Sequence, residues 1–152
     1  YVAAKAENFY KQALKDDSEN RVLAAQRNLQ QTVDLLMDVD KLLASHPLYR
    51  LEEWVELARN SGTTLQEKDA YEANAKRLIT SWGGIQEDYA ARFWSGLIKD
   101  YYIPRIQLYF TKGRNKIREW EEQWITSPWS NSTTPFDDPV EAALSLIEKT
   151  NK

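Results

Sequence analysis

The stretch ENRVLAAQRNLQQTVDLLMDVDKLLA, residues 19–44, decides the fold that the sequence predicts. It contains no glycine and no proline, so nothing in it interrupts a helix. Six of its apolar residues recur at intervals of three, four or seven, which place them on one helix face: Val22, Ala25, Leu29, Val33, Leu36 and Leu43. We therefore expect one long amphipathic helix here, the central rod of a helical bundle.

The rest of the chain favours the same fold class. The five glycines and five prolines cluster at breaks between long segments that suit helices. We expect a single all-α domain over residues 1–152, a bundle of five or six mostly antiparallel helices. The other expected helices cover residues 1–15, 47–59, 64–81, 85–124 with a kink at Pro104, and 139–147, with a loop at 126–137 before the last.

Polar residues mark several of the expected helix starts. Thr64 and Glu67 have the spacing of a capping box, in which each side chain accepts a hydrogen bond from the other residue's backbone N–H. Asp138 stands directly before a proline and is expected to cap the last helix. Ser18 is expected to cap the central helix, and Pro47 suits the first turn of the third.

Composition limits the class of protein. A hydrophobic fraction of 42% with six tryptophans and eight tyrosines indicates a folded globule. The net charge of -3 gives no attraction to nucleic acid or to an anionic membrane, and no apolar run approaches the roughly 18 residues that span a bilayer. The absence of cysteine excludes disulfides and thiolate chemistry. We expect neither a nucleic-acid nor a membrane partner.

The chain offers weak material for catalysis or metal binding. Its adjacent acid pairs include Glu52-Glu53, Glu121-Glu122 and Asp137-Asp138. Neighbours on a helix point about 100° apart, so none of these makes a facing pair of carboxylates, and we expect solvated faces and helix caps. His46, the single histidine, precedes a proline and is expected to cap a helix. We predict no catalytic residue, no metal ligand and no cofactor in this chain.

Asp40 is the acid that does not fit a solvated face. The spacing from Leu36 to Leu43 places it within the apolar stripe of the central helix. An unpaired buried carboxylate is expensive. We therefore expect Asp40 to be at least half buried and paired, with Arg77 and Arg92 as candidate partners.

The segment SWGGIQEDYAARFWSGLIKDYYIPR, residues 81–105, has a composition that helix packing alone does not require. Its two adjacent glycines at 83–84 allow a sharp turn, which leaves Trp82 on a loop just before the expected fifth helix. Beyond them Tyr89, Phe93, Leu97 and Tyr101 recur every four residues and predict an aromatic stripe on one helix face.

The same residues carry a resemblance to a known family. The ordered matches are DLLMDVDKLLAS at 34–45, WVELAR at 54–59, YEAN at 71–74, and then WG at 82–83, DYA at 88–90, GL at 96–97 and YYIPR at 101–105. Together they resemble the C-terminal helical domain of α-N-acetylglucosaminidases, glycoside hydrolase family 89, over roughly residues 20–110.

This resemblance implies a function that the residues alone do not. It implies that the chain is part of a larger glycoside hydrolase and packs on an upstream catalytic (β/α)8 barrel, which needs about 250 residues of its own. In the family both catalytic glutamates belong to that barrel, so the chain alone is expected to be inactive. The resemblance also implies an extracytoplasmic parent that removes terminal α-linked N-acetylglucosamine from glycans.

The resemblance assigns three residues to the wall of the substrate pocket: Trp82, Tyr89 and, beside them, Ile85. An aromatic face suits the apolar face of a sugar ring, and a phenol hydroxyl can bind a sugar hydroxyl. Judged from the residues alone, plain core packing is the alternative for Trp82 and Tyr89. The alternative for the whole chain is a freestanding helical protein-interaction or carbohydrate-binding module, with Trp82, Trp94 and Trp129 as its contact patch.

Overall fold

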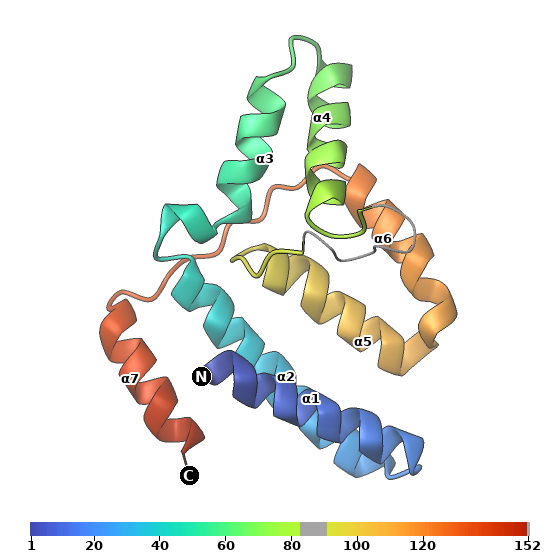
Figure 1. Ribbon diagram of the computed structural model, residues 1–152, viewed down its shortest axis with the longest axis vertical. Helices are drawn as coiled ribbons and strands as arrows, with labels where there is room; N and C mark the ends of the chain where they lie inside the picture. The colour runs from blue at the N-terminus through green and yellow to red at the C-terminus, as the bar shows by residue number, and fades with distance from the viewer. Residues whose placement is uncertain (83–90, 152) are drawn as a thin grey trace.

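The computed structural model describes residues 1–82 and 91–151, and within these ranges it contains seven α-helices and no β-strand (Figure 1). The helices are α1 (Val2–Ser18), α2 (Val22–Leu43), α3 (Leu51–Asn60), α4 (Leu65–Leu78), α5 (Ile103–Lys112), α6 (Ile117–Thr126) and α7 (Pro139–Thr150). The expected all-α class is confirmed. None of these helices is long and apolar enough to cross a membrane.

The central helix α2 follows its sequence pattern. Its buried face includes Ala25, Leu35, Leu36 and Val39, and α1 runs antiparallel along it (Figure 1). The boundary between the two helices differs from the expectation, because Ser18 ends α1 instead of capping α2. Asn20 adopts φ 58°, a left-handed conformation that asparagine tolerates and that stops a helix.

A buried carboxylate fixes this first helix pair. Asp16 in the last turn of α1 accepts hydrogen bonds from Gln12 at 2.9 Å, Arg21 at 2.5 Å and Asn28 at 2.7 Å. The hydrogen bond from Arg21 is the main reason why the pKa of Asp16 lies below its usual value. The contact therefore joins the end of α1 to the beginning of α2.

The apolar interior has two parts. The first lies among α1, α2, α5 and α7 and is formed by Val2, Ala6, Leu35, Leu36, Val39, Ile98, Ile103 and Leu146. The second lies beneath α3, α4 and α6 and is formed by Leu51, Val55, Ile79, Leu97 and Tyr101, with Trp54, Trp94, Trp120, Trp124 and Trp129 packed against it. The helical segment that begins at Leu97 contributes to both parts.

The expected continuous helix at 85–124 is wrong at residues 91–94 and in the middle; its first residues, 85–90, lie outside the described part of the chain. Residues 91–94 are irregular, so Phe93 does not belong to a helical stripe with Leu97 and Tyr101. Before Pro104 the chain makes a π-helical turn, Ile98–Tyr102, in which the N–H of Ile103 bonds to the carbonyl of Ile98. Because Pro104 has no N–H to donate to the carbonyl four residues earlier, the helix widens here instead of only kinking.

Gly113 ends α5. The break that it makes divides the expected single helix into α5 and α6, which raises the number of α-helices in the described residues to seven. Gly113 adopts φ 73° and ψ 175°, which favours glycine strongly, and it separates α5 from α6. Elsewhere the expected signals hold: Thr64 and Glu67 form the capping box of α4, and Asp138 accepts from the backbone at the start of α7. Pro47 opens a short 3-10 turn, Pro47–Tyr49, capped by the side chain of His46, and α3 follows it.

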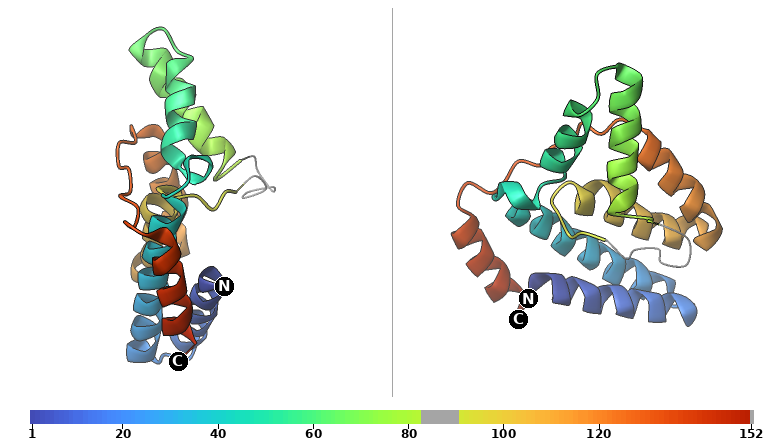
Figure 2. Two further views of the ribbon diagram at one scale, coloured as in Figure 1. Left: turned by 90° about the vertical axis from the view of Figure 1, so that its left-hand side faces the viewer. Right: turned by 45° about the horizontal axis from the view of Figure 1, so that its top comes forward.

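The two helix pairs occupy opposite ends of the molecule. The α3–α4 hairpin stands at one end, whereas α1, α2, α7 and both termini lie toward the other (Figure 2). The hydroxyl of Tyr1 donates to the side chain of Asn151, which brings the first and last described residues together. The C-terminal end of α4 lies at the base of the α3–α4 hairpin, toward the rest of the domain (Figure 1).

Gly96 provides a test of how tightly the two parts of the interior meet. It adopts φ 84°, and a Cβ added to it would lie 2.9 Å from the ring of Trp129 and 3.2 Å from Leu51. We expect Gly96→Ala to combine left-handed strain with overpacking, each of about 1–3 kcal/mol of unfolding free energy. Urea denaturation measures the loss. The matched control is Gly113→Ala, where φ is 73° but no atom lies within 4 Å, so only the strain remains; equal losses would contradict the close contact.

Candidate functional site

Of the three predicted pocket residues, the structure describes one. Trp82 follows the C-terminal end of α4, and its side chain is 41% exposed. Tyr89 and Ile85 lie outside the described residues, which resume at Ala91. The structure shows how the chain is held before Trp82, at the end of α4, and after Ala91, where the described residues resume.

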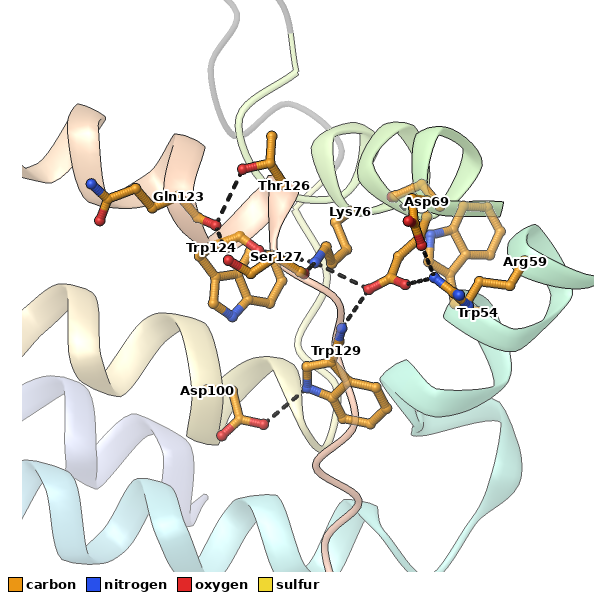
Figure 3. A network of polar contacts seen from close by, with 12 residues as sticks. Trp54, Arg59, Asp69, Lys76, Asp100, Gln123, Trp124, Thr126, Ser127 and Trp129 are labelled. Carbon is orange, nitrogen blue, oxygen red and sulfur yellow. Dashed lines mark hydrogen bonds and ion pairs between the residues drawn. The ribbon is translucent and has the colours of Figure 1, made fainter. Parts of the chain in front are cut away.

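On the α4 side, the chain is held by a buried lysine. Lys76, whose side chain is 1% exposed, bonds to Glu72 at 3.2 Å and to the carbonyls of Trp124, at 2.9 Å, and Ser127 (Figure 3). Burial lowers the pKa of Lys76 below its usual value, an effect that Glu72 opposes. The hydroxyl of Thr80 donates to the carbonyl of Lys76 at 2.7 Å, so the chain is fixed two residues before Trp82.

Glu72 extends this contact into a network across three elements. Its carboxylate accepts from Arg59 of α3 at 2.7 Å and from the backbone N–H of Trp129 at 2.6 Å. Arg59 also bonds to Asp69 at 2.8 Å, and the two carboxylates raise the pKa of Arg59. The indole of Trp129 donates to Asp100 at 2.9 Å, while burial raises the pKa of Asp100 (Figure 3).

This network was not predicted, although the sequence held a signal for it. Residues 72, 75, 76 and 79 share one face of α4, and Ala75 and Ile79 on that face are buried. Glu72 and Lys76 therefore occupy core positions, and their opposite charges suit a buried pair. This signal is weak, because α4 has few small and apolar residues and its buried face becomes clear only when the neighbouring helices are in place.

On the other side, the chain is held at Ser95 and Gly96. Ser95 donates its N–H to the carbonyl of Tyr49 at 2.8 Å, and its carbonyl accepts from Leu51 at 2.9 Å. The N–H of Gly96 donates to the carboxylate of Asp40 at 2.8 Å. The described chain is thus held on the α4 side through Lys76 and, from Ser95 onward, by groups that belong to other elements.

The expectation for Asp40 is half right. Its side chain is buried, as the apolar stripe indicates. The expected arginine partner is wrong: Asp40 accepts instead from backbone and hydroxyl donors of residues 95–99 and Thr133. Arg77 bonds to Glu122 at 2.5 Å and 3.0 Å and lowers the pKa of that carboxyl. A site that already offers several uncharged donors has no need of a cation.

One of the acid pairs is less exposed than expected. Glu121 accepts from the hydroxyl of Tyr101 at 2.9 Å and from Arg105 at 2.6 Å, and its side chain is 12% exposed. The expectation of a solvated face is therefore wrong for Glu121. Both contacts link α6 to the helix before it, so they have a structural role. Among the residues that the structure describes, no cluster of His, Cys, Asp or Glu could hold a metal ion.

The surface around Phe93 is apolar. Phe93, which is 43% exposed, lines a groove of about 460 Å3 together with Ala3, Tyr10, Leu36, Tyr102 and Ile106. Trp94 and Trp129 do not share this exposure, because both are half buried against the second part of the interior. The three tryptophans of the alternative contact patch therefore differ in their surroundings.

Comparison with known proteins gives consistent results for sequence and fold. Residues 1–149 match the family model described as alpha-N-acetylglucosaminidase (NAGLU) C-terminal domain, a wider range than the 20–110 that the motifs cover. Human α-N-acetylglucosaminidase is 38% identical over 78 residues, which is 50% of this chain and 10% of the human protein.

Solved structures share the fold. A family 89 glycoside hydrolase from Clostridium perfringens in complex with PUGNAc matches 97% of this chain with a TM-score of 0.80 at 21% identity. A second structure from this bacterium, in complex with its substrate GlcNAc-α-1,4-galactose, matches 97% with a TM-score of 0.77 at 22% identity. The chain spans only 19% of the length of each of these chains.

Lys76 permits a test of the buried network. Lys76→Met keeps an unbranched side chain but leaves the carbonyls of Trp124 and Ser127 without this donor. It also removes one of the three donors to Glu72, which keeps Arg59 and the N–H of Trp129. We expect the free energy of unfolding to fall by about 3–5 kcal/mol, the range for breaking a buried pair by removing one partner. The matched control is Lys11→Met, because Lys11 also bonds four residues back, to Glu7 at 2.7 Å, with side chains that are 66% and 60% exposed. The control should lose about 0.5 kcal/mol or less; a similarly small loss for Lys76→Met would show that the network is dispensable.

Proposed function

Because the chain belongs to the α-N-acetylglucosaminidase C-terminal domain family, we propose that it is the non-catalytic helical domain of a family 89 glycoside hydrolase. In this function it packs on the catalytic barrel and lines part of the substrate pocket. The observation that carries the proposal is the family match over residues 1–149. The short span of this chain within its relatives supports the presence of further domains in the parent.

The substrate of the parent would be a glycan with a terminal α-linked N-acetylglucosamine. The substrate named for the Clostridium perfringens enzyme, GlcNAc-α-1,4-galactose, has this linkage and supports the proposal. The acid and nucleophile would be two carboxylates of the barrel. Four carboxylates of this chain, Asp16, Asp40, Glu72 and Glu121, are each held by several donors from within the domain, which supports a structural role for these four.

Trp82, Tyr89 and Ile85 are the proposed contribution of this domain to the pocket. Trp82 has the exposure that contact with a sugar requires, since 41% of its side chain is accessible. The chain is fixed two residues before Trp82, at Thr80, which would help to hold an aromatic face in position without contributing chemistry.

The catalytic barrel is the proposed occupant of the apolar surface near this segment. Phe93, a few residues beyond the proposed wall residues in the sequence, lines an apolar groove. Four-fifths of each solved family 89 chain lies outside the part matched here, which leaves ample protein to cover such a surface. The alternative, a freestanding binding module, gains no support from Trp94 and Trp129, because both are half buried.

The first test asks whether this domain has hydrolytic activity by itself. The 152-residue chain, purified alone, should not hydrolyse an aryl α-N-acetylglucosaminide, because it lacks the two barrel carboxylates. The assay follows release of the aryl alcohol, with the full-length parent as the positive control. Turnover by the isolated chain that persists through repeated purification would contradict the proposed division of roles.

The second test concerns the pocket wall. In the full-length parent, Trp82→Ala should raise KM about 3- to 10-fold with a smaller change in kcat, because an aromatic contact is worth about 0.5–1.5 kcal/mol. Steady-state kinetics with the same aryl substrate measures both constants. Tyr71→Ala is the control, since Tyr71 on α4 is similarly exposed, at 44%, and has no proposed contact with substrate. An unchanged KM for Trp82→Ala would remove Trp82 from the pocket.

A further inference from the structure

We propose that the outward face of α7 is a docking surface for an amphipathic helix of the parent protein, a helix that lies outside these 152 residues. The inference rests on the function proposed above only in that it requires a larger parent. It goes further because it identifies a second surface of the domain and the kind of element that covers it.

The helix α7 carries apolar side chains on two of its faces. Leu146 is 7% exposed and packs into the first part of the interior. Leu144 points about 160° away from it, since each residue turns a helix by about 100°. On that other face Val140, Leu144 and Ile147 are 70%, 59% and 38% exposed. A helix that is apolar all round is normally buried, yet the described domain covers only one of these two faces.

A groove continues the exposed face of α7. It has a volume of about 340 Å3, and α1, α2 and α7 contribute to its lining through Val2, Ala3, Val39, Leu42, Ala143 and Ile147. Because Ile147 belongs to both the groove and the exposed face, the apolar surface runs from the groove along α7 to Val140, about 10 Å at 1.5 Å per residue. The helix stands at the edge of the domain, beside the start of α1 (Figures 1 and 2). The surface is therefore open to an element from outside the domain.

The shape of this surface suits a helix. Its side chains belong to three helices, and side chains spaced three and four residues apart form the ridges and grooves into which another helix packs. A helix bound in such a groove inserts apolar residues at positions i, i+3 or i+4, and i+7. Val140, Leu144 and Ile147 have the same spacing, so a partner helix with this pattern would cover the stripe and the groove together. Among residues 1–82 and 91–151 there is no β-strand to which an extended segment could add.

The parent is the source of the docking helix. This domain covers only 19% of each matched family 89 chain, so a parent of similar length would hold many further segments. A segment of the same polypeptide is present at a far higher effective concentration than a separate protein. The helix α7 also needs such packing, because it has 12 residues, of which only Leu146 is buried, and isolated helices shorter than about 12–15 residues are marginal.

Thiol accessibility tests the proposal, because this chain contains no cysteine. Leu144→Cys places one thiol on the proposed surface. Leu65→Cys is the control, since Leu65 is 69% exposed and begins α4 in the hairpin, at the end of the molecule away from α7 (Figure 2). In the isolated 152-residue chain both thiols should react with a maleimide at similar rates.

The full-length parent should separate the two variants. There the Leu144→Cys thiol should react at least about tenfold more slowly than in the isolated chain, because labelling requires the docked helix to open. The Leu65→Cys thiol should keep its rate, and mass spectrometry of the labelled peptides measures both. Val140→Cys, one turn earlier on the same face, should be protected in the same way. Equal rates for the Leu144→Cys and Leu65→Cys thiols in the parent would overturn the proposal.

A cross-link identifies what covers α7. A benzophenone maleimide on the Leu144→Cys thiol of the full-length parent should cross-link to a peptide outside this domain that has apolar residues at helical spacing. Mixing parents of two isotopic compositions distinguishes a cross-link within one molecule from one between two copies. A cross-link between copies, or to a segment without helical spacing, would show that the proposed occupant is wrong.

These results are independent of the pocket-wall function. If Trp82→Ala raises KM but the Leu144→Cys thiol reacts freely in the parent, the docking of α7 is wrong and the proposed function stands. If a helix of the parent protects this thiol while Trp82→Ala leaves KM unchanged, the pocket role of Trp82 fails and the docking of α7 stands.

Discussion

The helical segment from Leu97 to Lys112 is the constraint on which the rest of the fold depends, because both parts of the interior require it. Ile98 and Ile103 face the α1–α2 side, whereas Leu97 and Tyr101 face α3, α4 and α6. Ile103 is five positions after Ile98. In an ordinary α-helix, two side chains at this spacing would point in different directions. The π-helical turn brings both side chains to the same side of the helix. This turn, which lies next to Pro104, therefore lets one helix pack against both parts of the interior.

Buried carboxylates then determine how the segments around this helix fit together. Glu72 and Asp40 lie on different helices, and each holds a different point of the loop between α6 and α7, Trp129 in one case and Thr133 in the other. Taking a carboxylate out of water is costly unless its donors are in place. Among the described residues, no buried side-chain nitrogen or oxygen lacks a partner. Because losing any one of these contacts would leave a buried polar group without its partner, they favour a single arrangement of the loop.

The sequence predicted what depends on local patterns and missed what depends on other elements. The periodicity of α2, the capping box at Thr64 and the cap at Asp138 all involve residues within one or two turns. The burial of Asp40 was also visible in the apolar stripe. Its partners were not, because Thr133 lies 93 residues away and the other donors include backbone groups, which carry no mark in a sequence. The break at Gly113 was overlooked because the apolar period continues across it.

The proposed wall segment shows how these constraints meet. The residues at its two ends are buried and hydrogen-bonded, Thr80 to the lysine network and Ser95 to residues 49–51 and Asp40. Between them, Trp82 and Phe93 remain exposed, although an exposed large aromatic gains nothing for the stability of the isolated domain. A segment with fixed ends and exposed aromatic side chains is well suited to contact a surface outside its own domain. In the proposed function, the stability of the interior would hold this surface for contact with the catalytic barrel.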